Sequence, residues 1–438
     1  MLAKQINALG VFLLLMYIYL CMLMCPEGLH MKKSVLKKYA ELIVKVGANV
    51  QKGQDVIVMA GVEQEELVSY IVEYCYKYKA NAVEVRWQSD KVAKIMYKKE
   101  SVKALSYVPT WKIEREKEIN RTLPAFIYIE SSDPDALKGV DQMKLAQVAK
   151  NVSPIFKPFR DERDNKYQWT IAGAPSKEWA KKVFPELPVK KAVEKLWEAI
   201  LKTSRFTEDP IKAWNEHNED LNKRTQYLNS LNLDYLVYKS SNGTDFKVWL
   251  IENSKFLAGG ERTLGSNIFF NPNIPTEECF TSPIAGKCEG IVYSSKPLSY
   301  QGELIENFSV RFENGKAVEV HAEKGEELLN HMISMDEGAC KLGEVALVPY
   351  DSPINNTGIL FLSTLYDENA ACHLALGKGF SNCIKDYEKY SFEELKNMGI
   401  NDSTIHVDFM IGSKDLNITG VTRDGKEVAI FKNGNWAF

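Results

Sequence analysis

Residues 55–87, DVIVMAGVEQEELVSYIVEYCYKYKANAVEVRW, decide the fold of the first half of the chain. The pattern predicts a strand at 55–60, an amphipathic helix at 63–79 and a second strand at 82–87. Short apolar strands that are separated by a helix, with no two-residue turn between them, are typical of a parallel sheet covered on both faces.

The same alternation extends on both sides of this unit. A helix is predicted at 33–46, helices follow near 90–121, and further strands are predicted at 125–130 and 169–172. The sequence SSDP at 131–134 is a helix-start signal after the strand at 125–130. We therefore expect residues 31–220 to form an α/β domain with a mainly parallel sheet.

The second half of the sequence has a different pattern. A helical stretch at 189–231 leads into a region with four Asn-Gly or Asp-Gly pairs, at 242–243, 314–315, 424–425 and 433–434, each flanked by alternating β-type residues. Such pairs are the strongest short-range hairpin signals. Helices are predicted at 326–335, 370–376 and 391–398. Residues 221–438 are thus expected to be an α+β, largely antiparallel domain.

Residues 1–30 stand apart from both halves. Residues 8–25, ALGVFLLLMYIYLCMLMC, are nearly unbroken apolar sequence, which is a membrane-type signal. One interpretation is a signal peptide or membrane anchor. The other is translation from an upstream start codon, because Met31 opens a clean amphipathic helix. We predict contact with a membrane only if residues 8–25 are a genuine anchor.

Composition excludes several classes of protein. The 438 residues are 45% hydrophobic and 26% charged, and a formal net charge of −3 gives no electrostatic attraction to nucleic acid. The eight cysteines are scattered singly, without a Cys-x-x-Cys pair. That usage does not suggest a disulfide framework and predicts a cytoplasmic protein.

The candidate chemistry lies in the second half. His406 and Asp408 fall in the apolar run 405–411, where a strand would point both side chains to one face. Two of the histidines and four of the carboxylates in this half suit a hydrolytic site with two divalent cations, which would make residues 221–438 a dinuclear-metal catalytic domain. A structural cross-strand pair is the alternative for His406 and Asp408.

The acidic candidates have alternatives of their own. Glu277 and Glu278 are adjacent, so in extended chain only one of them faces a given site, and a solvated acidic pair is the ordinary interpretation. Glu344 heads a buried strand, where a carboxylate must be coordinated or paired, for example with Lys341.

Glu368 and His373 are five residues apart, which would separate them by about 140° on a continuous helix. Asn369 is predicted to cap a short helix that Gly377 closes, with Glu368 just outside it and His373 one turn inside. Convergence of the two side chains on one ion needs this break in the backbone. A structurally satisfied histidine is the alternative for His373.

Four motifs in order make the chain recognisable: PTEECFTSP at 275–283, GEVALVP at 343–349, DENAACHLALG at 367–377 and HVDFMIG at 406–412. Together they resemble the aminopeptidase T family, the M29 metallo-aminopeptidases. The resemblance covers residues 31–438.

The resemblance implies a homodimeric exopeptidase that removes residues from peptides with a free N-terminus, using two divalent ions. Zinc, cobalt, magnesium and manganese are the candidate metals. The resemblance places the ligands on Glu278, Glu344, Glu368, His373, His406 and Asp408, with Glu344 bridging the two ions. All six residues are present.

The expected reaction is attack of an activated water on the scissile carbonyl, one ion polarising that oxygen and the other holding the substrate's α-amine. Glu277 is a candidate general base, with a structural role as its alternative.

At the substrate-binding position after the Leu-Ala-Leu-Gly turn, the family usually has a tyrosine and this chain has Phe380. Losing such an oxyanion donor can cost about 10²- to 10³-fold in rate. The alternatives are therefore a weak or inactive metal- or peptide-binding relative, or another dinuclear amidohydrolase.

Overall fold

The computed structural model of the protein describes residues 31–438. The apolar segment at 8–25, and with it the predicted anchor or upstream start, lies outside the described residues. Within the described range, no helix is both long and apolar enough to span a membrane.

A five-stranded parallel sheet forms the centre of the first half. Its strands are β1 (Val56–Gly61), β2 (Val83–Gln88), β3 (Ala125–Glu130), β4 (Trp169–Gly173) and β10 (Asn273–Ile274), in the order β10-β4-β3-β1-β2. The predicted parallel sheet is confirmed. Its last strand, β10, comes from the second half of the chain, so the two halves share this sheet.

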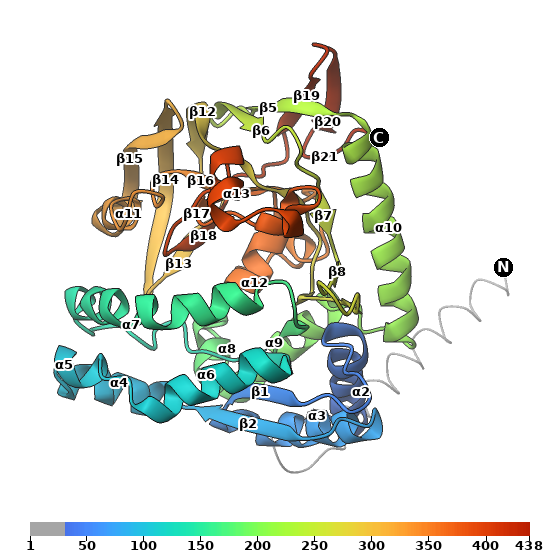
Figure 1. The fold of residues 1–438 in the computed structure, drawn as a ribbon, viewed down its shortest axis with the longest axis vertical. Helices are drawn as coiled ribbons and strands as arrows, with labels where there is room; N and C mark the ends of the chain where they lie inside the picture. Colours follow the sequence, from blue (N-terminus) through green and yellow to red (C-terminus); the bar gives the residue numbers. More distant parts are fainter. Residues whose placement is uncertain (1–30) are drawn as a thin grey trace, which may run out of the picture.

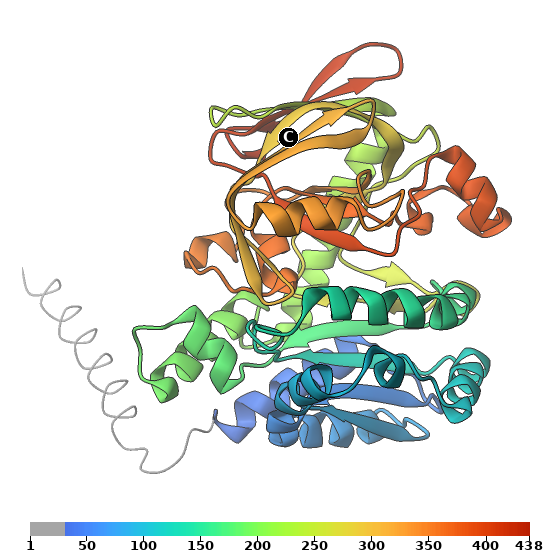
Figure 2. The same ribbon diagram turned by 90° about the vertical axis from the view of Figure 1, so that its left-hand side faces the viewer.

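Helices cover both faces of the sheet, as Figure 2 shows for the lower layer. Val56 and Val58 pack into the main core with α2 and α3, whereas Ile57 packs on the other face with Ile119 of α6. The helical segments of this half are α2 (Lys33–Leu42), η1 (Ile43–Gly47), η2 (Val62–Gln64), α3 (Glu65–Lys77), α4 (Asp90–Lys99), α5 (Val102–Leu105), α6 (Thr110–Thr122), α7 (Gln142–Arg163), α8 (Lys177–Val183) and α9 (Val189–Thr203).

The helix start predicted at 131–134 is wrong. A series of turns follows β3, and α7 begins only at Gln142. Its cap is Asp141, whose carboxylate accepts hydrogen bonds from the backbone N–H groups of Met143 and Lys144. A cap of this kind satisfies donors that the helix itself leaves unpaired, and Asp141 supplies it ten residues later than SSDP suggested.

Two large sheets form the second half. One is a five-stranded antiparallel sheet with the order β18-β17-β16-β11-β7; the other has nine strands with the order β13-β14-β12-β6-β5-β19-β20-β21, and β15 pairs with β14. A two-stranded ribbon, β8-β9, accompanies them. The strands are β5 (Leu233–Lys239), β6 (Asp245–Leu250), β7 (Leu257–Ala258), β8 (Glu261–Arg262), β9 (Phe269–Phe270), β11 (Cys279–Thr281), β12 (Pro283–Tyr293), β13 (Leu298–Tyr300), β14 (Glu303–Glu313), β15 (Lys316–Lys324), β16 (Leu342–Leu347), β17 (His373–Gly377), β18 (His406–Met410), β19 (Asn417–Thr422), β20 (Glu427–Lys432) and β21 (Asn435–Trp436).

The hairpin predictions are confirmed. The four Asn-Gly and Asp-Gly pairs lie in the turns β5–β6, β14–β15, β19–β20 and β20–β21. The helical segments of this half are α11 (Glu326–Ile333), η3 (Asn355–Thr357), α12 (Thr364–Asp367), η4 (Glu368–Ala370), η5 (Ser381–Cys383), η6 (Tyr387–Lys389) and α13 (Phe392–Met398). The helices predicted at 326–335 and 391–398 are therefore confirmed.

The helix predicted at 370–376 is wrong, and with it the role of Asn369 as a helix cap. The segment is strand β17, hydrogen-bonded to β16 on one side and β18 on the other. Every residue of this strand is buried. A strand buried on both faces has a continuous apolar sequence without alternation, which cannot be told from a short buried helix by periodicity.

A single long helix, α10 (Pro210–Ser230), runs along one side of the molecule from the α/β layer to the upper sheets (Figure 1). Trp214 of this helix packs into the core of the first half, and Leu221 into the core of the second. The domain boundary predicted between residues 220 and 221 falls inside α10 and stays a prediction.

Candidate metal centre

Strand register brings four of the six predicted ligands to one face of the five-stranded sheet. In an antiparallel pair, residues directly opposite each other point to the same face. Glu344 of β16 lies opposite Ala375 of β17, and Ala375 lies opposite Asp408 of β18. His406 is two residues from Asp408 on the same strand and therefore shares its face, and His373 shares the face of Ala375 for the same reason.

The other face of this sheet belongs to the hydrophobic core. Val345, Leu374 and Phe409 form a row across the three strands, all buried in the core of the second half. The alternation therefore separates a polar face from an apolar one. Ala375 and Gly377 carry little or no side chain on the polar face, which leaves space above the middle strand between the ligand candidates.

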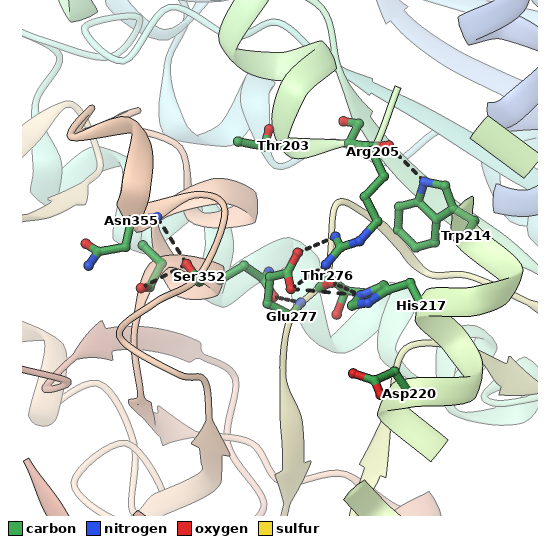
Figure 3. Close-up of polar contacts among 12 residues, drawn as sticks. Thr203, Arg205, Trp214, His217, Asp220, Thr276, Glu277, Ser352 and Asn355 are labelled. Carbon is green, nitrogen blue, oxygen red and sulfur yellow. Dashed lines mark hydrogen bonds and ion pairs between the residues drawn. The ribbon is translucent and has the colours of Figure 1, made fainter. Parts of the chain in front are cut away.

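Glu278, directly before β11, reaches the same face. Phe280 lies opposite Ala346, which lies opposite His373, and Glu278 precedes Phe280 by two residues. Its Oε2 lies 3.2 Å from His373 Nε2. The prediction that only one of the two adjacent glutamates faces the site agrees with this geometry, because the carboxylate of Glu277 is held elsewhere by Arg205 (Figure 3).

The candidate ligands fall into two groups that share one residue. Glu278, Glu344 and His373 each offer a ligand atom within 4.8 Å of the others, and Glu344, His406 and Asp408 do the same. His406 Nε2 lies 3.2 Å from both Glu344 Oε2 and Asp408 Oδ1. Lys341, the alternative partner of Glu344, pairs instead with Glu337.

Glu368 belongs to neither group. It begins η4, is turned toward the same cavity, and its Oε1 accepts a hydrogen bond from Asn369 Nδ2 at 3.2 Å. Burial, followed by the nearby carboxylates Asp408 and Glu278, raises its pKa well above the usual value. A buried carboxyl group among other carboxylates is stable in its ionised form only with a cation beside it.

Both histidines present the same nitrogen to the carboxylates. His373 Nδ1 lies 3.3 Å from the carbonyl of Ala371, and His406 Nδ1 lies 2.7 Å from that of Lys378. Since a carbonyl only accepts, Nδ1 carries the hydrogen in each ring. With a cation bound between the rings and the carboxylates, each ring would be neutral and would direct the lone pair of Nε2 at the ion. A backbone hydrogen bond of this kind is how metal-binding imidazoles are oriented.

The electrostatics of the histidines follow from this crowding. Burial alone would lower the pKa of His373, but Glu278, Glu344 and Asp408 outweigh it and raise the pKa to about 10. The same competition between burial and the carboxylates of Asp408 and Glu344 raises the pKa of His406 well above its usual value.

The carboxylates respond to the same surroundings. Burial, opposed by His406, raises the pKa of Glu344 to about 7. Asp408 Oδ1 is buried and makes no hydrogen bond. Imidazole and carboxylate donors with an unsatisfied oxygen among them fit divalent ions such as Zn²⁺ or Co²⁺.

All six predicted ligands and Phe380 line a cavity of about 490 Å³. Its wall also includes Glu130, the last residue of the parallel strand β3, and Trp169, the first residue of β4. Both halves of the chain therefore contribute to the cavity. Two further lining carboxylates, Glu130 and Glu261, were not predicted. Glu130 ends a parallel strand, and the carboxyl edge of such a sheet is a signal that could have found it; Glu261 has no comparable signal.

Among the described residues that line this cavity there is no lysine or arginine. Burial and the neighbouring Asp164 and Glu278 raise the pKa of Glu261 to about 7. Burial also raises the pKa of Glu130. The cavity therefore favours cations.

Phe380 lies over the polar face of the sheet. Its ring centroid is 4.9 Å from that of His406 and 5.5 Å from that of Phe280. Two tyrosines near this position in the sequence, Tyr366 and Tyr387, are not among the residues that line the cavity. Tyr366 is fully buried, with its ring stacked on Phe361.

Comparison with known proteins places this geometry in a family. Residues 32–436 match the family described as thermophilic metalloprotease (M29). The chain is 44% identical to aminopeptidase AmpS of Bacillus subtilis (strain 168) over 405 residues, which are 92% of this chain and 98% of that protein. It is 42% identical to aminopeptidase 2 of Geobacillus stearothermophilus, with the same coverage of 92% and 98%.

A solved structure is similar over the same range. Wild-type AmpT from Thermus thermophilus matches with a TM-score of 0.85 and 38% identity, covering 93% of this chain and 100% of that chain. The expected fold class, a parallel α/β half followed by a largely antiparallel half, is confirmed by the strand pairing and by this match.

Adding Co²⁺ to metal-free protein should raise its free energy of unfolding, because a bound cation offsets the repulsion among buried carboxylates. At a free ion concentration of 100 times the dissociation constant the gain is about 2.7 kcal/mol. Urea unfolding with and without the ion measures it. His406→Gln should reduce the gain, whereas His321→Gln should not, since His321 is an exposed histidine beside Glu319. An equal gain in all three proteins would contradict a metal centre at this face.

Proposed function

The chain belongs to the M29 family of thermophilic metalloproteases and is a metal-dependent aminopeptidase, and we propose that it works with two divalent ions at the face described above. We propose as ligands the two groups that share Glu344, with Glu368 as a sixth residue. Its substrates are peptides, as the aminopeptidase relatives imply.

The position of Glu344 is the observation that carries the two-ion proposal. It is the one described residue that belongs to both groups of candidate ligand atoms. It forms one group with Glu278 and His373, and the other group with His406 and Asp408. A carboxylate has two oxygens and can bridge two ions, which is the role the resemblance gives this residue.

The bound ions would polarise the scissile carbonyl and lower the pKa of the attacking water. The residues around them supply the rest. Backbone carbonyls hold both imidazoles by Nδ1, so that Nε2 faces the cavity. Burial on a rigid sheet fixes the carboxylates before substrate arrives, and pre-organisation of this kind avoids a reorganisation cost during the reaction.

The charge of the cavity supports a preference for a free N-terminus. Four carboxylates among the six proposed ligands would offset the charge of two divalent ions. Glu130 and Glu261 line the cavity in addition to these four, and no lysine or arginine of the described chain does. A surplus of carboxylates attracts the α-ammonium group of a peptide and disfavours a blocked one.

The activity can be tested by adding metal back to chelator-treated protein comprising residues 31–438. Free leucyl peptides should release leucine with Co²⁺, Zn²⁺, Mn²⁺ or Mg²⁺, and N-acetylated leucyl peptides should not, because acetylation removes the charged amine. Metal content should reach two ions per chain. Glu344→Gln should lower the occupancy of both sites.

The outcomes separate the alternatives. Turnover of the acetylated peptide would favour a general amidohydrolase. Two bound ions with no release of amino acid from any free peptide would favour an inactive metal- or peptide-binding relative. One ion per chain at saturation would contradict the shared role of Glu344.

Phe380→Tyr should raise the rate constant for turnover. A phenol at this position, beside His406 and at the wall of the cavity, could donate a hydrogen bond to the developing oxyanion, which a phenylalanine cannot. A single such donor contributes up to about 10²- to 10³-fold. Measuring kcat and KM on one leucyl peptide tests this, with Phe280→Tyr as the matched control. An unchanged kcat would mean that the missing donor does not limit this enzyme.

We propose that the protein is a homodimer, as the resemblance implies. The edge strand β2 and the segment that follows it support an interface between copies, since six large apolar residues there are exposed: Trp87, Val92, Ile95, Met96, Tyr107 and Trp111. An exposed strand edge beside apolar side chains is a surface that proteins usually cover. Light scattering should show a dimer, and Ile95→Glu should weaken it. A monomer at micromolar concentration would contradict the proposal.

A further inference from the structure

Glu277, the candidate general base, points away from the metal centre. Its two carboxylate oxygens each accept a hydrogen bond from Arg205, one from Nη1 and the other from Nη2 at 2.7 Å (Figure 3). The Glu277 side chain is 6% exposed and that of Arg205 is 20% exposed. Glu277 does not line the cavity. The general-base role stays a prediction, and this geometry favours the structural alternative.

Arg205 is itself held in an unusual conformation. It follows the C-terminal end of α9 and has a φ of 53°, in the left-handed region that residues other than glycine rarely adopt. Such a backbone costs on the order of 1–3 kcal/mol and persists where the surroundings enforce it. One contact that does so is the indole of Trp214, whose Nε1 donates to the carbonyl of Ser204 at 2.8 Å.

The same helix fixes the other side of the ion pair. His217 lies one turn after Trp214 on α10, with the two rings edge to face at 5.7 Å. Its Nε2 donates to the carbonyl of Thr276 at 2.8 Å, directly before Glu277. Helix α10 therefore contacts both the turn that carries Arg205 and the loop that carries Glu277 and Glu278.

A third contact continues toward Glu368. The side chain of Asn369 is fully buried, and its Oδ1 accepts the backbone N–H of Glu277 at 2.7 Å. Its Nδ2 donates to Glu368 Oε1 at 3.2 Å. One amide thus connects the backbone beside Glu278 with the carboxylate of Glu368. This is also why Asn369 is polar although it caps no helix.

We propose that the Arg205–Glu277 ion pair, with Asn369, positions Glu278 and Glu368 for metal binding. The inference rests on the proposed metal centre. Glu278 lies in a loop without regular secondary structure, between β10 and β11. The direction of its side chain therefore depends on contacts made by the neighbouring residues. A buried ion pair is weak evidence for stability by itself, since apolar replacements are often neutral. This ion pair, however, is linked to the two segments that carry Glu278 and Glu368, so its role is to position these two residues. Partners behind metal ligands commonly change metal affinity by 10- to 100-fold.

The test compares Glu277→Gln with Glu116→Gln in the full chain. Glu116 forms the matched control pair with Arg163, also largely buried but in the first half, at 2.8 Å and with side-chain exposures of 12% and 10%. Competition with a chelator measures the affinity of each protein for Co²⁺, the visible absorption of bound Co²⁺ reports the ligand geometry, and urea unfolding of the metal-free proteins measures stability.

Both substitutions should lower stability, because each leaves an arginine buried without its partner. Only Glu277→Gln should lower Co²⁺ affinity, by about 10- to 100-fold for at least one ion, and change the absorption. Arg205→Lys keeps the charge but loses the two-pronged contact, so it should give a smaller loss in a protein that folds readily. In the Arg205→Lys background, Glu277→Gln should add little.

Two results would overturn the proposal. If both variants bind Co²⁺ as the native chain does, the ion pair contributes only to stability. If Glu277→Gln lowers kcat with unchanged affinity and absorption, Glu277 takes part in the chemistry as the general base. Failure of the native chain itself to bind Co²⁺ would instead overturn the proposed metal centre, which separates the two hypotheses.

Discussion

The alternation of side chains in one antiparallel sheet is the constraint on which the candidate site depends. Strands β16, β17 and β18 place hydrophobic residues on one face, where Val345, Leu374 and Phe409 are buried in the core. The opposite face must then carry Glu344, His373, His406 and Asp408. A shift of one residue in any strand would exchange the two faces. Burial of the apolar face therefore fixes the register, and the register fixes the polar cluster.

This arrangement carries an electrostatic cost, and no lysine or arginine among the described cavity-lining residues relieves it. Glu278, Glu344 and Asp408 have the two imidazoles as partners, whose Nδ1 atoms are already bonded to backbone carbonyls. In the described part of the chain, Arg205 lies behind this face and pairs with Glu277. Its positive charge is thus on the far side of the loop, and the face itself has a surplus of carboxylates that suits added cations.

Much of this could be predicted from sequence, and the failures have physical reasons. His406 and Asp408 were predictable because a strand has a two-residue period, and the hairpins because Asn-Gly turns are local. The segment at 370–376 was not, since both of its faces and both of its edges are buried, so its sequence has no period to read. The interaction of Arg205 with Glu277 joins residues far apart in sequence, and no local pattern records it.

The cavity also explains why the two halves of the chain depend on each other. Strand β10 leaves the second half to join the parallel sheet beside β4, and the loop that follows it leads directly to Glu278. Glu130 at the carboxyl end of β3 and Trp169 at the amino end of β4 in turn belong to the cavity wall. The first half therefore forms one wall of a cavity whose proposed metal ligands all lie in the second half. A substrate in this cavity would contact both halves, and its affinity would depend on how β10 and α10 hold them together.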